Sequence, residues 1–312
     1  MSTENAVDTQ AKRERWYEKY TEVWQYRELL YQMVLRDLRL RYKQTIIGFA
    51  WALFTPMMIV ASGCIIKLAM SQLSGAAFDL MSFAGMTVKA VTWSFLSGGL
   101  AFGSMCLVSN IGLVTKIYFP REVFPLSGIL IQIFDTFIAA LVLGVLFLIL
   151  GVPLTFQALW LPFLVLQAIC LITAVIMLVS TANVFYRDVK YITGVILSFG
   201  IFFSPVFYEP QVFGPQGNLA IMANPVSPIL EGIRLTLVGT PDSTERVQNA
   251  DGTLTQPTYH TVNLLDTVYI NDGKTLVWTP WYLVYSSILS FGGLIYAWRK
   301  FHRLEFIFPE YI

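Results

Sequence analysis

Gly273, Lys274 and Thr275 have the residue types that end a phosphate-binding loop, in which backbone N–H groups and a lysine hold nucleotide phosphates. The motif GxxxxGK[ST] also requires a glycine five positions before Gly273, and that position is Val268. No other segment of the sequence has the residues to hold ATP phosphates. We therefore expect this chain to have no ATP site of its own.

Other candidates for catalysis are few. The two histidines, His260 and His302, lack the spacing of a metal-ligand set, and the sequence has no nucleophile elbow. The three cysteines lie far apart within apolar segments, which is typical of small core residues. We expect no catalytic residue and no metal site, and therefore a protein that is not an enzyme.

Asp135 is the one acidic residue inside a long apolar stretch. A carboxylate at membrane depth is a functional candidate by default. The alternative, which we favour, is a helix contact that satisfies Asp135 beside Gln132 and Thr136. A proton-coupled carrier would have to use Asp135 with Lys67 or Lys89, and it would need no ATPase partner.

Long segments without charge dominate the chain, which is 55% hydrophobic and 13% charged with a mean hydropathy of +0.60. These values are extreme for a soluble domain. A bilayer core takes about 20 apolar residues to cross as a helix and disfavours each buried ion by a few kcal/mol. The charge gaps predict an all-α integral membrane protein with six transmembrane helices, at about 45–68, 84–109, 126–150, 158–184, 190–208 and 280–298.

The basic residues fix the predicted orientation, because basic loops stay in the cytoplasm. Nine of the 21 Lys and Arg residues precede the first span, and others cluster in the second loop, the fourth loop and the C-terminus. Loops of the opposite parity carry only Arg234, Arg246 and Lys274. We expect a multi-pass protein with both termini in the cytoplasm.

The N-terminal region divides into a mobile cytoplasmic tail (1–20) and an amphipathic interface helix (21–44) that is basic and rich in Trp and Tyr. One interpretation is a plain topology anchor. The other is a helix that also meets a lipid-linked anionic substrate or a cytoplasmic subunit. Its basic end offers donors to phosphate, and these candidate residues are Arg36, Arg39, Arg41, Tyr42 and Lys43.

Two further segments are neither spans nor solvated linkers. Residues 109–126 mix charged and large apolar side chains between prolines, which favours a short helix pressed against a partner over a tight turn. Residues 210–230 carry no charge, yet four prolines and two glycines break any continuous helix. Irregular backbone at membrane depth must be buried or line a cavity, so we expect short re-entrant gate helices between spans five and six. The polar residues 239–278 then form an external lid or a docking site.

Five ordered blocks carry a family resemblance across most of the chain. The sequence resembles ABC type-2 exporter permeases, with its greatest likeness to the branch that exports O-antigens, capsular polysaccharides and teichoic acids. The blocks are RDLRLRYKQTIIGFAWALFTPMM (36–58), LVTKIYFPREVFPL (113–126), NVFYRDVKYITGVIL (183–197), FFSPVFY (202–208) and NPVSPI (224–229).

The resemblance implies partners that the residues alone do not specify. It implies a bacterial inner-membrane permease that pairs with a second copy of itself and with two ATP-binding cassette subunits, which bind the ATP and Mg. The lipid-linked polysaccharide and the bilayer are the remaining expected partners, and no nucleic acid is expected. It places ATPase-coupling residues at Lys116, Tyr118, Arg121 and Glu122, with Arg187 and Asp188 as a second contact or a surface anchor.

The expected mechanism alternates between a state open to the cytoplasm and a state open outward. Sugars would slide along aromatic faces on the translocation path. For each of these aromatic residues the alternative role is packing or lipid contact. The residues are Phe199, Phe202, Phe203, Phe207 and Tyr208. The outer gate would include Pro210, Asn224, Pro225 and Pro228. Two rival functions are export of a small hydrophobic compound and enzymatic modification of a lipid-linked glycan, which would require converging acids or histidines.

Overall fold

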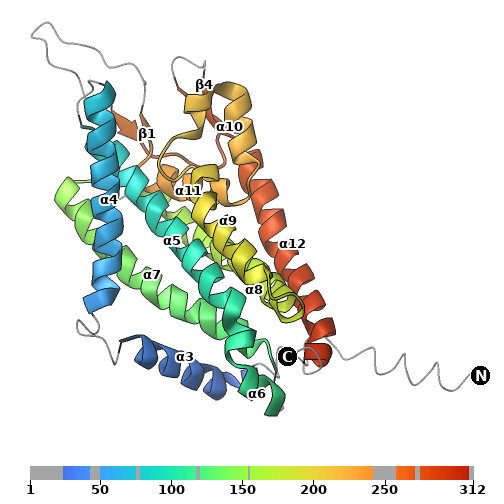
Figure 1. Ribbon diagram of the computed structural model, residues 1–312. Helices are drawn as coiled ribbons and strands as arrows, with labels where there is room; N and C mark the ends of the chain where they lie inside the picture. Colours follow the sequence, from blue (N-terminus) through green and yellow to red (C-terminus); the bar gives the residue numbers. More distant parts are fainter. Residues whose placement is uncertain are drawn as a thin grey trace, which may run out of the picture.

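The protein is described by a computed structural model that covers residues 24–42, 50–74, 78–116, 120–153, 155–241, 258–270 and 275–308. Within these residues the chain is a bundle of long helices with short helices and strands at one end (Figure 1). The helices are α3 (Arg27–Tyr42), α4 (Ala50–Ser74), α5 (Leu80–Ser109), α6 (Ile111–Lys116), α7 (Val123–Leu150), η1 (Phe156–Trp160), α8 (Leu161–Phe185), α9 (Val189–Phe203), η2 (Pro210–Phe213), α10 (Gly214–Met222), α11 (Val226–Leu237), α12 (Pro280–Leu304) and η3 (Glu305–Ile307).

A helix lies at each of the six segments predicted to span the membrane. Among the described residues, four helical stretches are long and apolar enough to cross a bilayer: Leu53–Leu73, Leu80–Ser109, Val123–Leu150 and Phe156–Phe185. The remaining two candidates are α9, with 15 residues, and α12, whose 25 residues include several polar and basic side chains. The all-α membrane fold is confirmed, and the crossing by α9 and α12 remains a prediction.

The fifth predicted span ends earlier than expected. It was expected to reach residue 208, but α9 ends at Phe203, and Ser204 is extended with φ −110° and ψ 142°. Ser204 precedes Pro205, and the residue before a proline is disfavoured in the helical region because its backbone meets the proline ring. Phe207 and Tyr208 therefore belong to the irregular segment that follows the helix.

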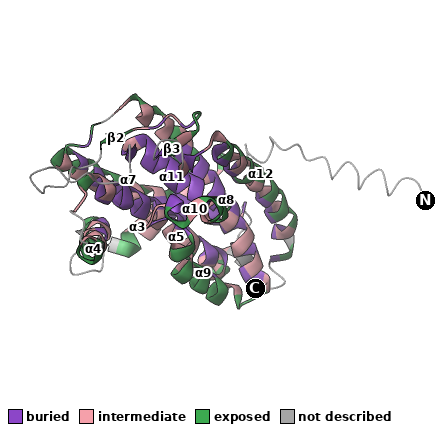
Figure 2. Ribbon diagram, turned by 90° about the horizontal axis from the view of Figure 1, so that it is seen from above, coloured by how far each residue is buried: buried purple, intermediate pink, exposed green. Residues whose placement is uncertain are grey.

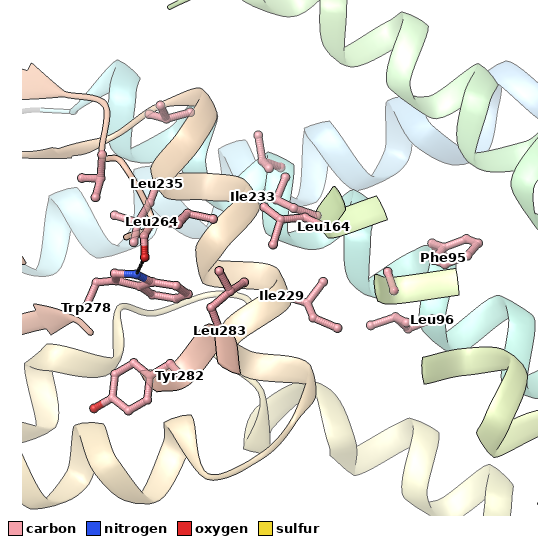
Figure 3. Packing of buried hydrophobic residues seen from close by; sticks show 14 of the residues in the cluster. Phe95, Leu96, Leu164, Ile229, Ile233, Leu235, Leu264, Trp278, Tyr282 and Leu283 are labelled. Carbon is pink, nitrogen blue, oxygen red and sulfur yellow. Dashed lines mark hydrogen bonds between the residues drawn. The ribbon is translucent and has the colours of Figure 1, made fainter. Parts of the chain in front are cut away.

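The buried core lies where α5, α8 and α12 enclose α11. These helices share an apolar cluster in which Leu164 of α8 and Ile229 and Ile233 of α11 are almost fully buried. Figure 3 shows Trp278 and Leu283 packed beside α11 in the same cluster. In contrast, α4 and α9 lie at the edge of the bundle and expose much of their surface (Figure 2).

Within the segment predicted as the interface helix (21–44) the structure has a helix, α3, which lies across one end of the bundle (Figure 1). Its place at the membrane interface remains a prediction. Its main contacts are with α7, and Met33 is its buried anchor. The predicted tail (1–20) and Lys43 lie outside the described residues.

Four short strands modify the expectation of an all-helical chain. β1 (Thr240–Pro241) pairs antiparallel with β2 (Tyr259–His260), and β3 (Val268–Ile270) pairs antiparallel with β4 (Thr275–Trp278). β3 and β4 are rich in β-branched and aromatic residues, which favour strands. The part of the 239–278 segment that the structure describes is therefore folded onto the bundle, and Trp278 Nε1 donates to Leu264 O at 3.0 Å.

The two ends of the bundle differ in character (Figure 1). One end, here called the gate end, carries η2, α10, α11 and the strands. The other, here called the basic end, carries α3, α6, the start of α7, the loop from α8 to α9 and the end of α12. The candidate functional residues divide between these two ends.

Candidate functional site

Four charged side chains meet at the gate end, and we call them the gate network: Lys89, Glu209, Glu231 and Arg234. Glu231 lies at its centre, with Oε1 2.9 Å from Arg234 Nε and Oε2 3.6 Å from Lys89 Nζ. Arg234 Nη1 lies 3.8 Å from Glu209 Oε1. Lys89, Glu231 and Arg234 are all at most 2% exposed. The network holds two cations and two carboxylates, so its charges balance inside a water-poor site.

Backbone groups complete the gate network. Lys89 Nζ donates to Tyr208 O at 2.7 Å, and Arg234 Nη1 donates to Gly239 O at 2.7 Å. The network therefore joins α5 and α11 to the loop after α9 and to the turn after α11. Buried charges are tolerated when they are paired and hydrogen-bonded. In this network the same bonds also link four segments of the chain.

A tyrosine from the strands secures the start of α5. Tyr259 of β2 donates its phenolic proton to Asp79 Oδ2 at 2.5 Å, while Asp79 Oδ1 caps α5 by accepting from the Met81 N–H. Burial raises the pKa of Tyr259, and the bond to Asp79 raises it further. Tyr259 therefore stays a neutral donor, and β2 is tied to the helix that carries Lys89.

Hydroxyl groups of α12 hold the turn between α10 and α11. Ser286 Oγ donates to Pro225 O at 2.8 Å and accepts from Gln167 Nε2 of α8 at 2.8 Å. The Tyr285 hydroxyl donates to Met222 O and lies 3.3 Å from Asn224 O. These contacts position the first turn of α11 against two long helices.

The predicted gate residues all lie in or beside these short helices. Pro210 begins η2 and is buried, Pro225 precedes α11, and Pro228 is buried in its first turn. Asn224 bridges two segments, because its Nδ2 donates to Ser204 Oγ at 3.2 Å and its Oδ1 accepts from the Val226 N–H at 3.1 Å. The broken helices expected from the prolines are present, and their role as a gate remains a prediction.

The gate network was not predicted from the sequence, where Lys89 was considered only with Asp135 in a proton-coupled carrier and Arg234 only as a loop charge. Two signals could have found it. Lys89 lies inside the predicted second span, and an ionisable residue there needs a partner. Glu231 and Arg234 stand three residues apart within the apolar stretch ILEGIRLTL, a spacing that places them on one face of a helix.

At the basic end, two of the arginines predicted to receive the substrate have partners within the chain. Arg36 Nε lies 2.7 Å from Asp37 Oδ1, and its Nη2 donates to Asn110 Oδ1 at 3.0 Å. Arg41 Nη1 donates to Asp135 Oδ2 of α7. Arg39 is exposed, Tyr42 ends α3 with a side chain outside the description, and Lys43 lies outside the described residues.

The carboxylate of Asp135 is satisfied by Arg41. We favoured a helix contact for this acid, and the helix that provides the contact is α3. Thr136 instead bonds within α7, donating to Gln132 O at 2.8 Å. Asp135 lies about 18 Å along the axis from the first residue of α7, so Arg41 holds α3 against the half of α7 that is nearer the basic end.

A double-mutant cycle tests this link. We expect Arg41→Gln and Asp135→Asn each to lower the thermal stability of the purified protein, and the double variant to lose less than the sum of the two. The expected coupling free energy is about 1 kcal/mol, because both groups are partly accessible. Strictly additive losses in the same detergent would show that the two side chains do not interact.

The predicted coupling residues divide between the surface and the interior. Lys116 ends α6, with its side chain outside the description, and Tyr118 lies outside the described residues. Arg121 is half-buried, with Cζ 5.8 Å from the centroid of the Phe308 ring. Glu122 is 2% exposed, and its Oε1 lies 3.6 Å from His302 Nδ1 of α12. Glu122 thus faces α12, so any coupling role for it would act through that helix.

Within the described residues, one group of side chains of the types that bind metals lies close together. It consists of Glu122, His302 and Glu305, whose ligand atoms are within 4.8 Å of one another. His302 Nδ1 is 2.5 Å from Glu305 Oε1. A protonated His302 would neutralise part of the charge of these two buried carboxylates. The cluster joins the start of α7 to the end of α12.

The predicted aromatic path is split by the end of α9. Phe199, Phe202 and Phe203 are exposed on the outer face of α9. Phe207 packs beside Val206 and Leu230, and the Tyr208 hydroxyl donates to Phe202 O at 2.9 Å. A separate apolar cavity of about 420 Å³ lies between α5, α7, α8 and α11, and none of the five predicted residues lines it.

These features define a multi-pass helical membrane protein with a buried charge network at the gate end and exposed basic residues at the basic end. Residues 28–238 match the ABC-2 type transporter family, and the chain belongs to that family. This confirms the resemblance carried by the five sequence blocks. The matched region runs from α3 to the end of α11 and so includes the gate network.

Two relatives add detail. The chain is 24% identical over 201 residues to the O-antigen export system permease protein RfbA of Myxococcus xanthus, covering 64% of this chain and 76% of the relative. It is 19% identical over 204 residues to the protein of the same name from Klebsiella pneumoniae, covering 65% and 77% of the two chains.

Proposed function

We propose that this chain is the membrane-spanning subunit of an ATP-driven exporter that moves a lipid-linked polysaccharide of the O-antigen type from the cytoplasm to the outside. The observation that carries the proposal is the similarity to O-antigen export permeases over about two thirds of this chain and three quarters of each relative. The family match across 28–238 supports the transport class.

The proposed assembly contains two copies of this chain and two ATP-binding cassette subunits. Exposed apolar side chains on α4 and α9 support a second copy, because such faces meet either lipid or a partner. ATP and Mg would be held by the separate subunits. In this orientation the basic end faces the cytoplasm of the bacterial inner membrane, in agreement with the excess of Lys and Arg there.

Closure of the ATP-binding subunits would push on the segment from α6 to the start of α7. Glu122 offers a route inward, because its carboxylate contacts His302 at the end of α12. The Tyr285 and Ser286 hydroxyls of α12 contact the turn before α11. A displacement of α12 would therefore reach the gate helices through contacts that the structure shows.

The substrate would approach at the basic end and leave past the gate end. Arg36, Arg39 and Arg41 are all exposed, and Arg36 and Arg41 bond to Asn110 and Asp135. Arg39 would therefore be the arginine that meets the diphosphate head, while Arg36 and Arg41 hold α3 in place. Phe199, Phe202 and Phe203 would offer weak contacts to sugars along α9.

Cells that lack this chain provide the test. We expect lipid-linked polysaccharide to be synthesised but retained inside the cell, and surface polysaccharide to return when the chain is supplied. Immunodetection before and after permeabilisation measures the two pools. Normal surface polysaccharide with reduced efflux of a small hydrophobic compound would instead favour the rival transport function.

A further inference from the structure

A second cavity lies at the basic end, in the angle between α8 and α9. Its volume is about 190 Å³, and it is enclosed by the last turns of α5, by α6, by the end of α8 and by the start of α9. Its walls are mainly apolar. The lining residues are Met105, Val108, Ile111, Asn183, Val184, Arg187 and Lys190.

Two cations stand at this cavity. Arg187 and Lys190 are exposed, and within the part of the chain that the structure describes neither forms an ion pair. Lys190 Nζ lies 4.8 Å from the centroid of the Tyr191 ring. Asp188 is next in sequence, is exposed, and its carbonyl accepts the Tyr191 and Ile192 N–H groups. The neighbouring Arg36 and Arg41, in contrast, already have carboxylate partners.

The buried polar side chain on the inner wall of this cavity has hydrogen-bond partners within the protein. Asn183 is 3% exposed, and its Nδ2 donates to Ser104 O at 3.1 Å and contacts Met105 Sδ at 3.4 Å. The cavity therefore combines an apolar wall with a positive mouth. An occupant should have an anionic group and a hydrocarbon part.

We propose that this cavity binds an anionic glycerophospholipid of the bilayer leaflet at the basic end. The phosphate would lie between Arg187 and Lys190, and the first part of an acyl chain would lie against Val108 and Val184. Basic pockets between transmembrane helices on the cytoplasmic side recognise such headgroups by charge. A cavity of this size is smaller than typical drug-sized ligand sites, so it holds the headgroup region while the chains remain in the bilayer.

The bound lipid would fill the angle at which α9 diverges from α8. Lipid binding and the predicted coupling role of Arg187 would exclude each other, because a phosphate held there would occupy the same guanidinium.

Native mass spectrometry of the purified full chain tests the proposal with two lipids that have identical acyl chains. We expect phosphatidylglycerol to bind more tightly than phosphatidylethanolamine. Arg187→Gln with Lys190→Gln should weaken phosphatidylglycerol binding about 20- to 30-fold, because each basic residue near a membrane surface contributes about fivefold. Both side chains are exposed, so the double variant should fold.

Lys300→Gln with Arg303→Gln is the matched control. It removes the same charge at the same end, and Lys300 Nζ likewise lies over a tyrosine ring, 5.8 Å from the Tyr296 centroid. We expect it to leave the first phosphatidylglycerol affinity within about threefold of the wild type, a small fraction of the effect expected at the cavity. Equal losses in the two double variants would overturn the proposal, as would equal binding of the two lipids. Displacement of phosphatidylglycerol by an isoprenoid diphosphate at lower concentration would also overturn it, by assigning the cavity to the substrate.

Discussion

Glu231→Gln should lower the free energy of unfolding by about 3–5 kcal/mol, because it removes the carboxylate between two buried cations. Lys89 and Arg234 are each 2% exposed and would then share only Glu209, whose Oε1 is 3.8 Å from Arg234. Glutamine keeps the shape of glutamate, so the loss reports charge rather than volume. Unfolding in mixed micelles with increasing SDS measures the change.

Two further variants separate the charge effect from a general weakness of the gate end. Glu209→Gln should cost less than Glu231→Gln, because Glu209 is more accessible and is not in hydrogen-bond contact with Arg234. Adding Lys89→Met to Glu231→Gln should restore part of the lost stability, since it removes one uncompensated cation at similar volume. Wild-type stability for Glu231→Gln alone would refute the buried network.

Gly239→Ala should destabilise the protein by about 3 kcal/mol or more, because two separate costs add at this position. Gly239 has φ +90°, which disfavours any residue with a Cβ. A Cβ there would also lie 2.2 Å from His260 O, which belongs to the backbone of β2. Relief of that clash would move β1 from β2 and disturb the bond from Arg234 Nη1 to Gly239 O.

Gly151→Ala provides the control for backbone conformation alone. Gly151 has φ +66° at the end of α7, and an added Cβ would meet nothing within 4 Å. We expect a loss of about 1–2 kcal/mol, the cost of a left-handed conformation with a side chain. Thermal unfolding of both variants gives the comparison. Equal losses would mean that the close approach of Gly239 to His260 is absent in solution.

The long helices could be predicted from charge alone, because a bilayer excludes unpaired ions over about 20 residues. The prolines from 210 to 228 likewise predicted broken helices. The end of α9 follows from a local rule that the hydropathy pattern does not contain, namely the restriction on the backbone of Ser204 before Pro205. The aromatic Phe207 and Tyr208 extend the apolar, uncharged stretch beyond the residue at which the helix ends.

Tertiary pairings could not be predicted, because their members are distant in the chain. Lys89 meets Glu231 from another helix, and Glu122 meets His302, which lies more than half of the chain length further along. Arg41 shows the consequence for function. Its basic character fitted a phosphate ligand, but which anion it meets depends on how α3 packs against α7. The coupling, path and gate assignments remain predictions for the same reason.

Polymer transfer into inside-out membrane vesicles is the measurement that tests the proposed function most directly. The vesicles contain this chain, the proposed ATP-binding cassette subunit and lipid-linked polysaccharide, and polymer that reaches the lumen is protected from a glycan-degrading enzyme. We predict that protection grows with time only when ATP, the cassette subunit and this chain are all present. Equal protection without this chain, or protection that does not require ATP, would contradict its assignment as the permease of an ATP-driven polysaccharide exporter.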